Sequence, residues 1–254
     1  MNLIHFASID STNAEALRRL AAAQNVRELD KTIIAADGQT AGRGRLKRAF
    51  YSPAQKGIYF TAICAPAAPI DDPARLTACA AVAVCRSLKE FFNVEAKIKW
   101  VNDIYVNDKK VCGILAEGHL GPDGHVDAAA IGIGINIYPS DFPAEIASRA
   151  GSVLDKDFSQ GQEMDDVRLN LARDVCQKLF DILDDGARTQ EAMQEYAGLS
   201  FIVGKEITVT PIIGDDRSAY PATVLGIDKK ARLLVRLDDG SERALSSGEI
   251  SIKI

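Results

Sequence analysis

The spacing of the apolar residues changes several times along this chain, and it limits the fold more than any other feature. Where apolar residues recur every three or four positions, the pattern predicts helices: one opening at 10–13, then 73–91, 164–183 and a shorter one to Tyr196. Where apolar and β-branched residues run together or alternate, it predicts strands over 32–36, 57–65, 96–101, 104–106, 111–117 and 126–137. This mixture predicts an α+β fold, in which helices pack on a mixed sheet. Thr12 and Glu15 have the spacing of a capping box, so Thr12 is expected to cap the first helix.

The pattern changes again after the last predicted helix. From Gly198 onward the chain has only short strand-like runs, at 206–209, 222–227, 233–237 and 250–254. We therefore expect two domains, a larger one over 1–197 and a small β-barrel over 198–254.

Charge and cysteine content exclude several classes of protein. A formal net charge of −5 argues against a surface built throughout to hold nucleic acid or anionic lipid, so a polyanion is expected to bind only locally. The five cysteines show no C-x-x-C spacing, which predicts reduced thiols and a cytoplasmic location. We find neither a signal peptide nor a run of about 18 apolar residues, and expect no membrane partner.

A basic loop is the strongest local signal for chemistry. Residues 42–48 read Gly-Arg-Gly-Arg-Leu-Lys-Arg, and no acid lies between Gly38 and Lys56. Such cations repel one another unless an anion joins them, and arginine matches phosphate oxygens in pairs. We interpret the loop as a clamp for a nucleotide-sized phosphate; a solvated basic loop is the alternative.

Three further patterns lie on predicted strands. Alternation places Lys97, Lys99 and Asp103 on one face of a strand pair, with Trp100 in the core, although Asn102-Asp103 also fits a plain turn. Lys110 leads into a strand that contains Gly113, a residue type that often marks close approach of a ligand; solvated turn lysines are the alternative. Glycines at 132 and 134 leave part of a sheet face without side chains, a flat slot for a thin ligand.

Taken in order, these motifs resemble those of the biotin protein ligases. The matching residues are Asp10-Ser11-Thr12-Asn13, Gln39-x-x-Gly42-Arg43-Gly44-Arg45, Lys99-Trp100-Val101-Asn102-Asp103, Lys110-x-x-Gly113-Ile114-Leu115 and Gly132-x-Gly134-x-Asn136. The resemblance implies a class II synthetase-like catalytic domain followed by an SH3-like barrel. It also implies a two-step reaction: biotin and ATP form biotinyl-5′-AMP and pyrophosphate, and a lysine of a biotin carboxyl carrier domain then takes the biotin.

The resemblance also assigns roles to residues. Lys110 and Arg45 are expected to be catalytic. Biotin is expected to contact Ser11, Thr12, Asn13, Gln39, Gly42, Arg43, Lys110, Gly113, Gly132 and Gly134. ATP is expected to contact Arg43, Arg45, Arg48, Phe50, Asn102, Asp103 and Asn136, with Mg²⁺ at Asp103.

Two residues depart from the family pattern: Val101 stands where proline is usual, and Phe50 where tryptophan is usual. About ten residues precede the first motif, so we expect no DNA-binding domain and no DNA partner; a homodimer fits the resemblance. A lipoate ligase-like enzyme and a non-catalytic biotin-binding module remain as alternative functions.

Overall fold

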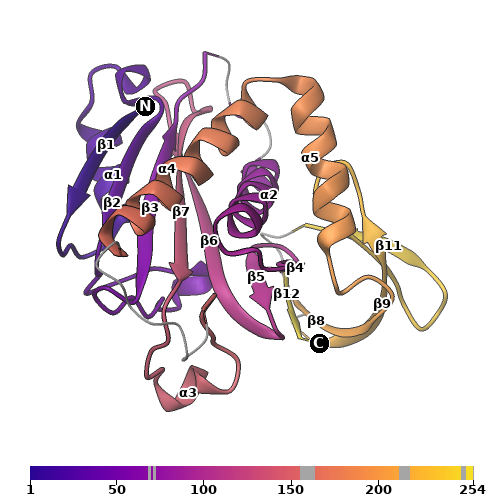
Figure 1. The fold of residues 1–254 in the computed structure, drawn as a ribbon. Coiled ribbons are helices and arrows are strands. Elements are labelled where there is room, and N and C mark those ends of the chain that lie inside the picture. The colour runs from indigo at the N-terminus through magenta and orange to yellow at the C-terminus, as the bar shows by residue number, and fades with distance from the viewer. Residues whose placement is uncertain (68–69, 71–72, 155–163, 212–217, 247–249, 254) are drawn as a thin grey trace.

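A computed structural model describes residues 1–67, 70, 73–154, 164–211, 218–246 and 250–253. Its centre is a seven-stranded sheet (Figure 1). The strands, in spatial order, are β1 (Asn2–Phe6), β2 (Thr32–Ala36), β3 (Gly57–Cys64), β7 (Val126–Asn136), β6 (Lys109–Leu120), β5 (Asp103–Val106) and β4 (Lys97–Lys99). Only the β1–β2 pair is parallel, so the sheet is mixed as expected.

Helices cover both faces of this sheet (Figure 1). They are α1 (Thr12–Ala22), α2 (Pro73–Phe92), α4 (Met164–Leu183) and α5 (Gly186–Leu199), with the short α3 (Ala144–Ala147) beyond β7. Isoleucines 131, 133 and 135 of β7 belong to the large core that includes α2 and α4, while alanines 128 and 130 pack with α1. Because side chains alternate along a strand, glycines 132 and 134 continue the α1 face. Helix α1 therefore covers the alanine end of β7, its first turn reaches Gly132 through Asn13, and the rest of the glycine end faces the cavity described below.

The first helix is capped by a different residue from the one expected. Ser11 is the N-cap, and its Oγ accepts a hydrogen bond of 3.4 Å from Ala14 N. The capping-box assignment of Thr12 and Glu15 is wrong, because the Thr12 hydroxyl contacts Gln39 and Thr61 instead. Glu15 pairs with Arg18 and Arg19.

The other expected elements differ mainly at their ends. Strand β1 was not expected, β4 is shorter than 96–101, and β6 is longer than 111–117. The β5–β6 turn lies at Asn107 and Asp108, whose φ angles of 48° and 59° suit these residue types.

The chain after α5 forms a second, antiparallel sheet of five strands. Their spatial order is β11 (Glu242–Leu245), β10 (Leu233–Arg236), β9 (Tyr220–Ile227), β8 (Glu206–Pro211) and β12 (Ile250–Lys253). Strand β11 was not predicted, because three of its four side chains are exposed and only the last is a large apolar one. Ile254, expected at the end of the last strand, lies outside the described residues.

Trp100 joins the two sheets, and its peptide bond to Val101 is cis. Its indole is buried in the core, as expected, and its Nε1 donates a 2.8 Å hydrogen bond to the carbonyl oxygen of Ala231, between β9 and β10. Nearby, the rings of Tyr105 and Phe201 meet edge to face at 5.2 Å. The second sheet therefore packs directly behind the segment that enters β5.

Two further findings concern the thiols and the helices. All five cysteines are buried and free, which agrees with thiols that serve in packing. Among the helices that the structure describes, none is long and apolar enough to cross a membrane.

Candidate functional site

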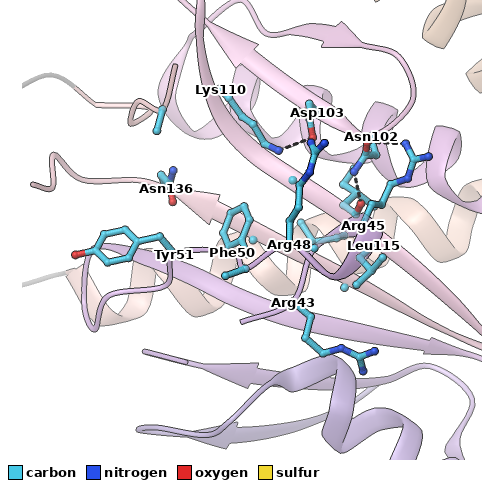
Figure 2. Close-up of a pocket in the computed structure, with 18 of the residues that line it drawn as sticks. Arg43, Arg45, Arg48, Phe50, Tyr51, Asn102, Asp103, Lys110, Leu115 and Asn136 are labelled. Atoms are coloured by element: carbon cyan, nitrogen blue, oxygen red, sulfur yellow. Dashed lines mark hydrogen bonds and ion pairs between the residues drawn. The ribbon is translucent and has the colours of Figure 1, made fainter. Parts of the chain in front are cut away.

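A cavity of about 710 Å³ lies on the α1 face of the large sheet, over the glycine end of β7 (Figure 2). Its walls come from the start of α1, the basic loop, the β4–β5 hairpin, the first half of β6 and residues 142–150. From Lys110 to Leu115 the floor runs along β6, and at about 3.4 Å per residue this spans about 17 Å. The cavity is long enough for a ligand with two chemically different ends.

A β-bulge aims Lys110 into this cavity. Residues 110 and 113 are an odd number apart, so a regular strand would place their side chains on opposite faces. The pairing of β5 with β6 shifts between Ile104 and Tyr105, which makes Val111 the extra residue. As a result Lys110 Nζ lies 3.4 Å from the position that a Cβ of Gly113 would occupy.

Lys110 lies in a cluster of charges at one end of the cavity. Its Nζ is 2.6 Å from Asp103 Oδ1 (Figure 2). Asp103 is opposite Lys99 in the β4–β5 pair, as the alternation predicted, and Arg48 and Arg149 also line this end. Burial, together with Lys110, Arg149 and Arg48, lowers the pKa of Lys99, while Asp103 partly offsets this. This end carries more positive than negative charge, since Asp103 is the one acidic residue among the described residues that line the cavity.

The arginines of the basic loop contact polar side chains that lie elsewhere in the chain. Arg43 Nη2 is 2.8 Å from Glu117 Oε1, and Arg43 points away from Lys110 and Arg48 (Figure 2). Arg45 Nη1 donates to Asn102 Oδ1 at 3.4 Å, and burial lowers the pKa of Arg45. Asn102 Nδ2 in turn donates to Ile114 O at 2.7 Å. The loop thus brings Arg45 and Arg48 to the cluster, while Arg43 lies apart from it.

Uncharged polar side chains form the opposite end of the cavity. The Oε1 atom of Gln39 accepts from Thr12 N at 2.9 Å and from Thr12 Oγ1 at 3.2 Å, and its Nε2 donates to Ser52 Oγ. Ser11, Thr12 and Asn13 are buried at the start of α1. This end offers hydrogen-bonding groups without a net charge.

The space beside the glycines of the site is filled by protein side chains. The sequence had predicted an open slot for a ligand there. A Cβ on Gly132 would lie 2.2 Å from Asn13 Oδ1, and one on Gly134 would lie 2.4 Å from the Phe50 ring. That ring also limits space at Gly113. Gly42 lines a smaller neighbouring hollow of about 570 Å³, and a Cβ there would lie 2.4 Å from Phe50 O. Phe50 and Asn13 therefore occupy the sheet face that the glycines leave free.

Several residues of the cavity carry no signal in the sequence. The segment 149–151 pairs with Lys110: Lys110 N donates to Arg149 O and Gly151 N donates to Lys110 O. Asn136 Nδ2 fastens the same segment through Gly151 O at 3.1 Å. Tyr51 and Phe142, whose rings lie 6.2 Å apart, close the cavity on this side. These hydrogen bonds join irregular segments that are far apart in the sequence, so no local sequence pattern predicts them.

The residues present suit a metal ion only together with a phosphate ligand. No cluster of three or more His, Cys, Asp or Glu side chains occurs in the described parts of the chain. Of the described residues that line the cavity, Asp103 is the one that offers a carboxylate. Mg²⁺ is commonly held by one or two carboxylates plus substrate phosphates, and Asp103 fits that smaller role.

Comparison with known proteins places this geometry in a family. Residues 5–136 match the model of the biotin/lipoate A/B protein ligase family, and residues 202–253 match the biotin protein ligase C terminal domain. Over 220 residues the chain is 31% identical to the bifunctional ligase/repressor BirA of Bacillus subtilis, covering 85% of this chain and 65% of that relative. It thus spans less than two thirds of that relative's length. The biotin protein ligase of Aquifex aeolicus, solved in complex with biotin and ATP, superposes with a TM-score of 0.76 at 27% identity, over 99% of this chain and 98% of that one. The chain therefore belongs to the biotin/lipoate A/B protein ligase family.

Proposed function

We propose that this chain is a biotin protein ligase, which activates biotin with ATP and transfers it to a carrier lysine. One observation carries the proposal: a single cavity joins a neutral, hydrogen-bonding end at Thr12 and Gln39 to a cationic end at Lys110 and Arg48. Biotin has a neutral cyclic urea at one end and a carboxylate at the other, and ATP adds phosphates beside that carboxylate. The presence of biotin and ATP in the Aquifex aeolicus structure supports the same assignment.

In the first step, a carboxylate oxygen of biotin attacks the α-phosphorus of ATP. A bond forms between that oxygen and phosphorus, the bond from phosphorus to the β-phosphate oxygen breaks, and pyrophosphate leaves. Two anions must approach, so cations are needed where their charge gathers. Lys110 suits this role because it is a compact charge that the bulge aims into the cavity. Arg45 and Arg48 suit the departing phosphates.

In the second step, a lysine amine of a biotin carboxyl carrier domain attacks the acyl carbon. An amide bond forms, the bond from the acyl carbon to the phosphate oxygen breaks, and AMP leaves while the amine gives up a proton. Both attacking groups belong to substrates, so the chain needs no nucleophile of its own. The acceptor is a carrier domain of a biotin-dependent carboxylase; the 36% identical ligase of Paracoccus denitrificans is named for acetyl-CoA carboxylase.

Mg²⁺ completes the proposed site. It would be held by Asp103 and by phosphate oxygens, and when bound it neutralises phosphate charge. Asp103 also keeps Lys110 oriented through their 2.6 Å contact.

The neutral end of the cavity favours biotin over lipoate. A urea ring both donates and accepts hydrogen bonds, and unpaired polar groups of a site penalise a ligand that lacks them. The dithiolane ring of lipoate offers no such donors, and it would leave Thr12 and Gln39 without ligand partners. The presence of Lys110 and the arginines argues against a non-catalytic binding module.

The test is a transfer reaction with purified components. We expect the protein, with ATP and Mg²⁺, to release pyrophosphate in the presence of biotin and to label a carrier domain with biotin. Adenylate formation with lipoate but not biotin would favour the lipoate ligase. Biotin binding without pyrophosphate release would favour the non-catalytic module.

We extend the proposal to organisation and compartment. The catalytic unit is assigned to 1–197 and the SH3-like barrel to 198–254. The five buried thiols agree with work in the reducing cytoplasm. A homodimer through the sheet edge remains a proposal that a sedimentation measurement tests.

A further inference from the structure

Glu117 lies at the junction of three elements and outside the main cavity. It is on β6 and lines the smaller hollow of about 570 Å³ next to the basic loop. Its Oε1 is 2.8 Å from Arg43 Nη2, and its Oε2 accepts a 2.8 Å hydrogen bond from Asn13 Nδ2. One carboxylate therefore holds the basic loop and the first turn of α1 at the same time.

Asn13 also forms hydrogen bonds to the buried face of the sheet. Its Nδ2 also donates to Leu115 O at 3.2 Å, and its Oδ1 accepts from Thr61 Oγ1 at 2.8 Å. Only 4% of Asn13 is exposed. Such a side chain has little freedom to turn, because turning would leave buried polar atoms unpaired.

The same network of hydrogen bonds also reaches the residues that follow the basic loop. Thr61 Oγ1 is 2.9 Å from Thr12 Oγ1, and Thr12 contacts Gln39. Gln39 Nε2 donates to Ser52 Oγ, which donates to Phe50 O at 3.0 Å. Arg43, near the start of the loop, and Phe50, just after its end, therefore belong to the same network of hydrogen bonds, which lies beneath the neutral end of the cavity.

We propose that Glu117 is a positioning residue, which holds the basic loop against the neutral end of the cavity by binding Arg43 and Asn13 together. The loop carries Arg45 and Arg48, so its position sets where these cations lie relative to Lys110. Glu117 lines the neighbouring hollow, and acts through Arg43 and Asn13 on the main cavity. The effect on biotin binding rests on the proposed function, whereas the effect on the loop does not.

The test uses Glu117→Gln, which can still accept from Asn13 and loses the ion pair with Arg43. In the ligand-free protein we expect trypsin to cleave after Arg45 and Arg48 about fivefold faster, the factor for a partly exposed ion pair worth about 1 kcal/mol. Glu195→Gln is the matched control, because Glu195 forms a similar ion pair with Arg86 on the helical side of the molecule. It should leave loop cleavage unchanged.

The second readout separates positioning from general stability. With Glu117→Gln we expect the KM for biotin to rise, by at most about fivefold, with kcat within about twofold, because an open loop lowers the population competent to bind. Loss of folded protein would lower kcat instead. If Glu117→Gln does not fold, Arg43→Gln breaks the same pair from its exposed side and should give the same faster cleavage after Arg45 and Arg48.

Equal cleavage of the loop in the wild type, Glu117→Gln and Glu195→Gln would overturn the proposal. Faster cleavage with an unchanged KM for biotin would overturn the link to binding. A protein that lacks biotin activity altogether would contradict the proposed function, and the cleavage comparison would still decide the role of Glu117.

Discussion

Gly132→Ala tests whether the space beside this glycine is occupied by the Asn13 side chain. The new Cβ would lie 2.2 Å from Asn13 Oδ1 and 2.8 Å from its Cγ. Atoms do not approach so closely, so the Asn13 side chain must leave its place. Moving it breaks its hydrogen bonds to Thr61, to Leu115 O and to the Glu117 carboxylate.

The cost follows from those three hydrogen bonds. Two neutral bonds at about 1 kcal/mol each and one to a carboxylate at about 2 kcal/mol sum to about 4 kcal/mol. The buried methyl group and the lower chain entropy of alanine in the unfolded state together return about 1–2 kcal/mol. We expect Gly132→Ala to lower the free energy of unfolding by about 2–3 kcal/mol.

Guanidinium unfolding, followed through the single tryptophan, measures this difference. Gly226→Ala is the control, because a Cβ there meets no atom of the described residues within 4 Å; it should change the free energy by less than about 0.5 kcal/mol. In an Asn13→Ala background the room is free, so Gly132→Ala should no longer destabilise and should raise the free energy of unfolding by about 1–2 kcal/mol. An equal cost with and without Asn13 would refute the reasoning.

Three further predictions follow from the charges and thiols. Lys110→Ala should cut pyrophosphate release at least about 100-fold and leave circular dichroism unchanged, because it removes the charge aimed at the reacting phosphate; undiminished release would contradict that role. Arg18 holds the pKa of Asp10 at about 2, below its usual value, so their contact stabilises the fold above about pH 4 and is lost as pH falls toward 2. Because the pair is exposed, Asp10→Asn should cost less than about 1 kcal/mol at pH 7 and clearly less near pH 2, where about half of the Asp10 carboxyls are protonated. Thermal unfolding at both pH values measures this, and a cost that did not change with pH would argue against the ion pair. Burial raises the pKa of the Cys64 and Cys85 thiols to about 12, so at pH 8 a thiol reagent should label them slowly until the chain unfolds; rapid labelling of the native protein would show that they are accessible.

The sequence predicted those parts of the site that depend on local spacing. Alternation was sufficient to place Lys99 and Asp103 together, because pairing across a hairpin keeps side chains on one face. The basic loop was recognised from its composition. The apolar periods gave the fold class and most strands, and the structure confirms both.

The parts that were missed depend on long-range pairing. Simple alternation would turn Lys110 away from Gly113, and only the bulge at Val111 brings them together. Arg149 reaches the cavity because its segment pairs with Lys110, a contact between residues that no local pattern connects. Glu117 reads as one more polar residue of an alternating strand, and its partners Arg43 and Asn13 lie far away in the sequence. The glycines were rightly seen as making room, but the sequence does not show which side chains fill it.

The hydrogen bond between Trp100 and Ala231 also has a consequence for the order of events during synthesis. The two residues are 131 positions apart, so at about 5–20 residues per second the ribosome needs on the order of ten seconds to supply the acceptor after the donor. The large sheet is fully translated early in that interval, because its last strand, β7, ends at Asn136, while the indole N–H of Trp100, directly after β4, still lacks its carbonyl. The packing behind the edge that carries Lys99 and Asp103 can therefore be completed only when Ala231 has emerged and has packed against Trp100. A nascent chain that stops short of Ala231 should lack this hydrogen bond behind the edge strand, however well its first strands have paired.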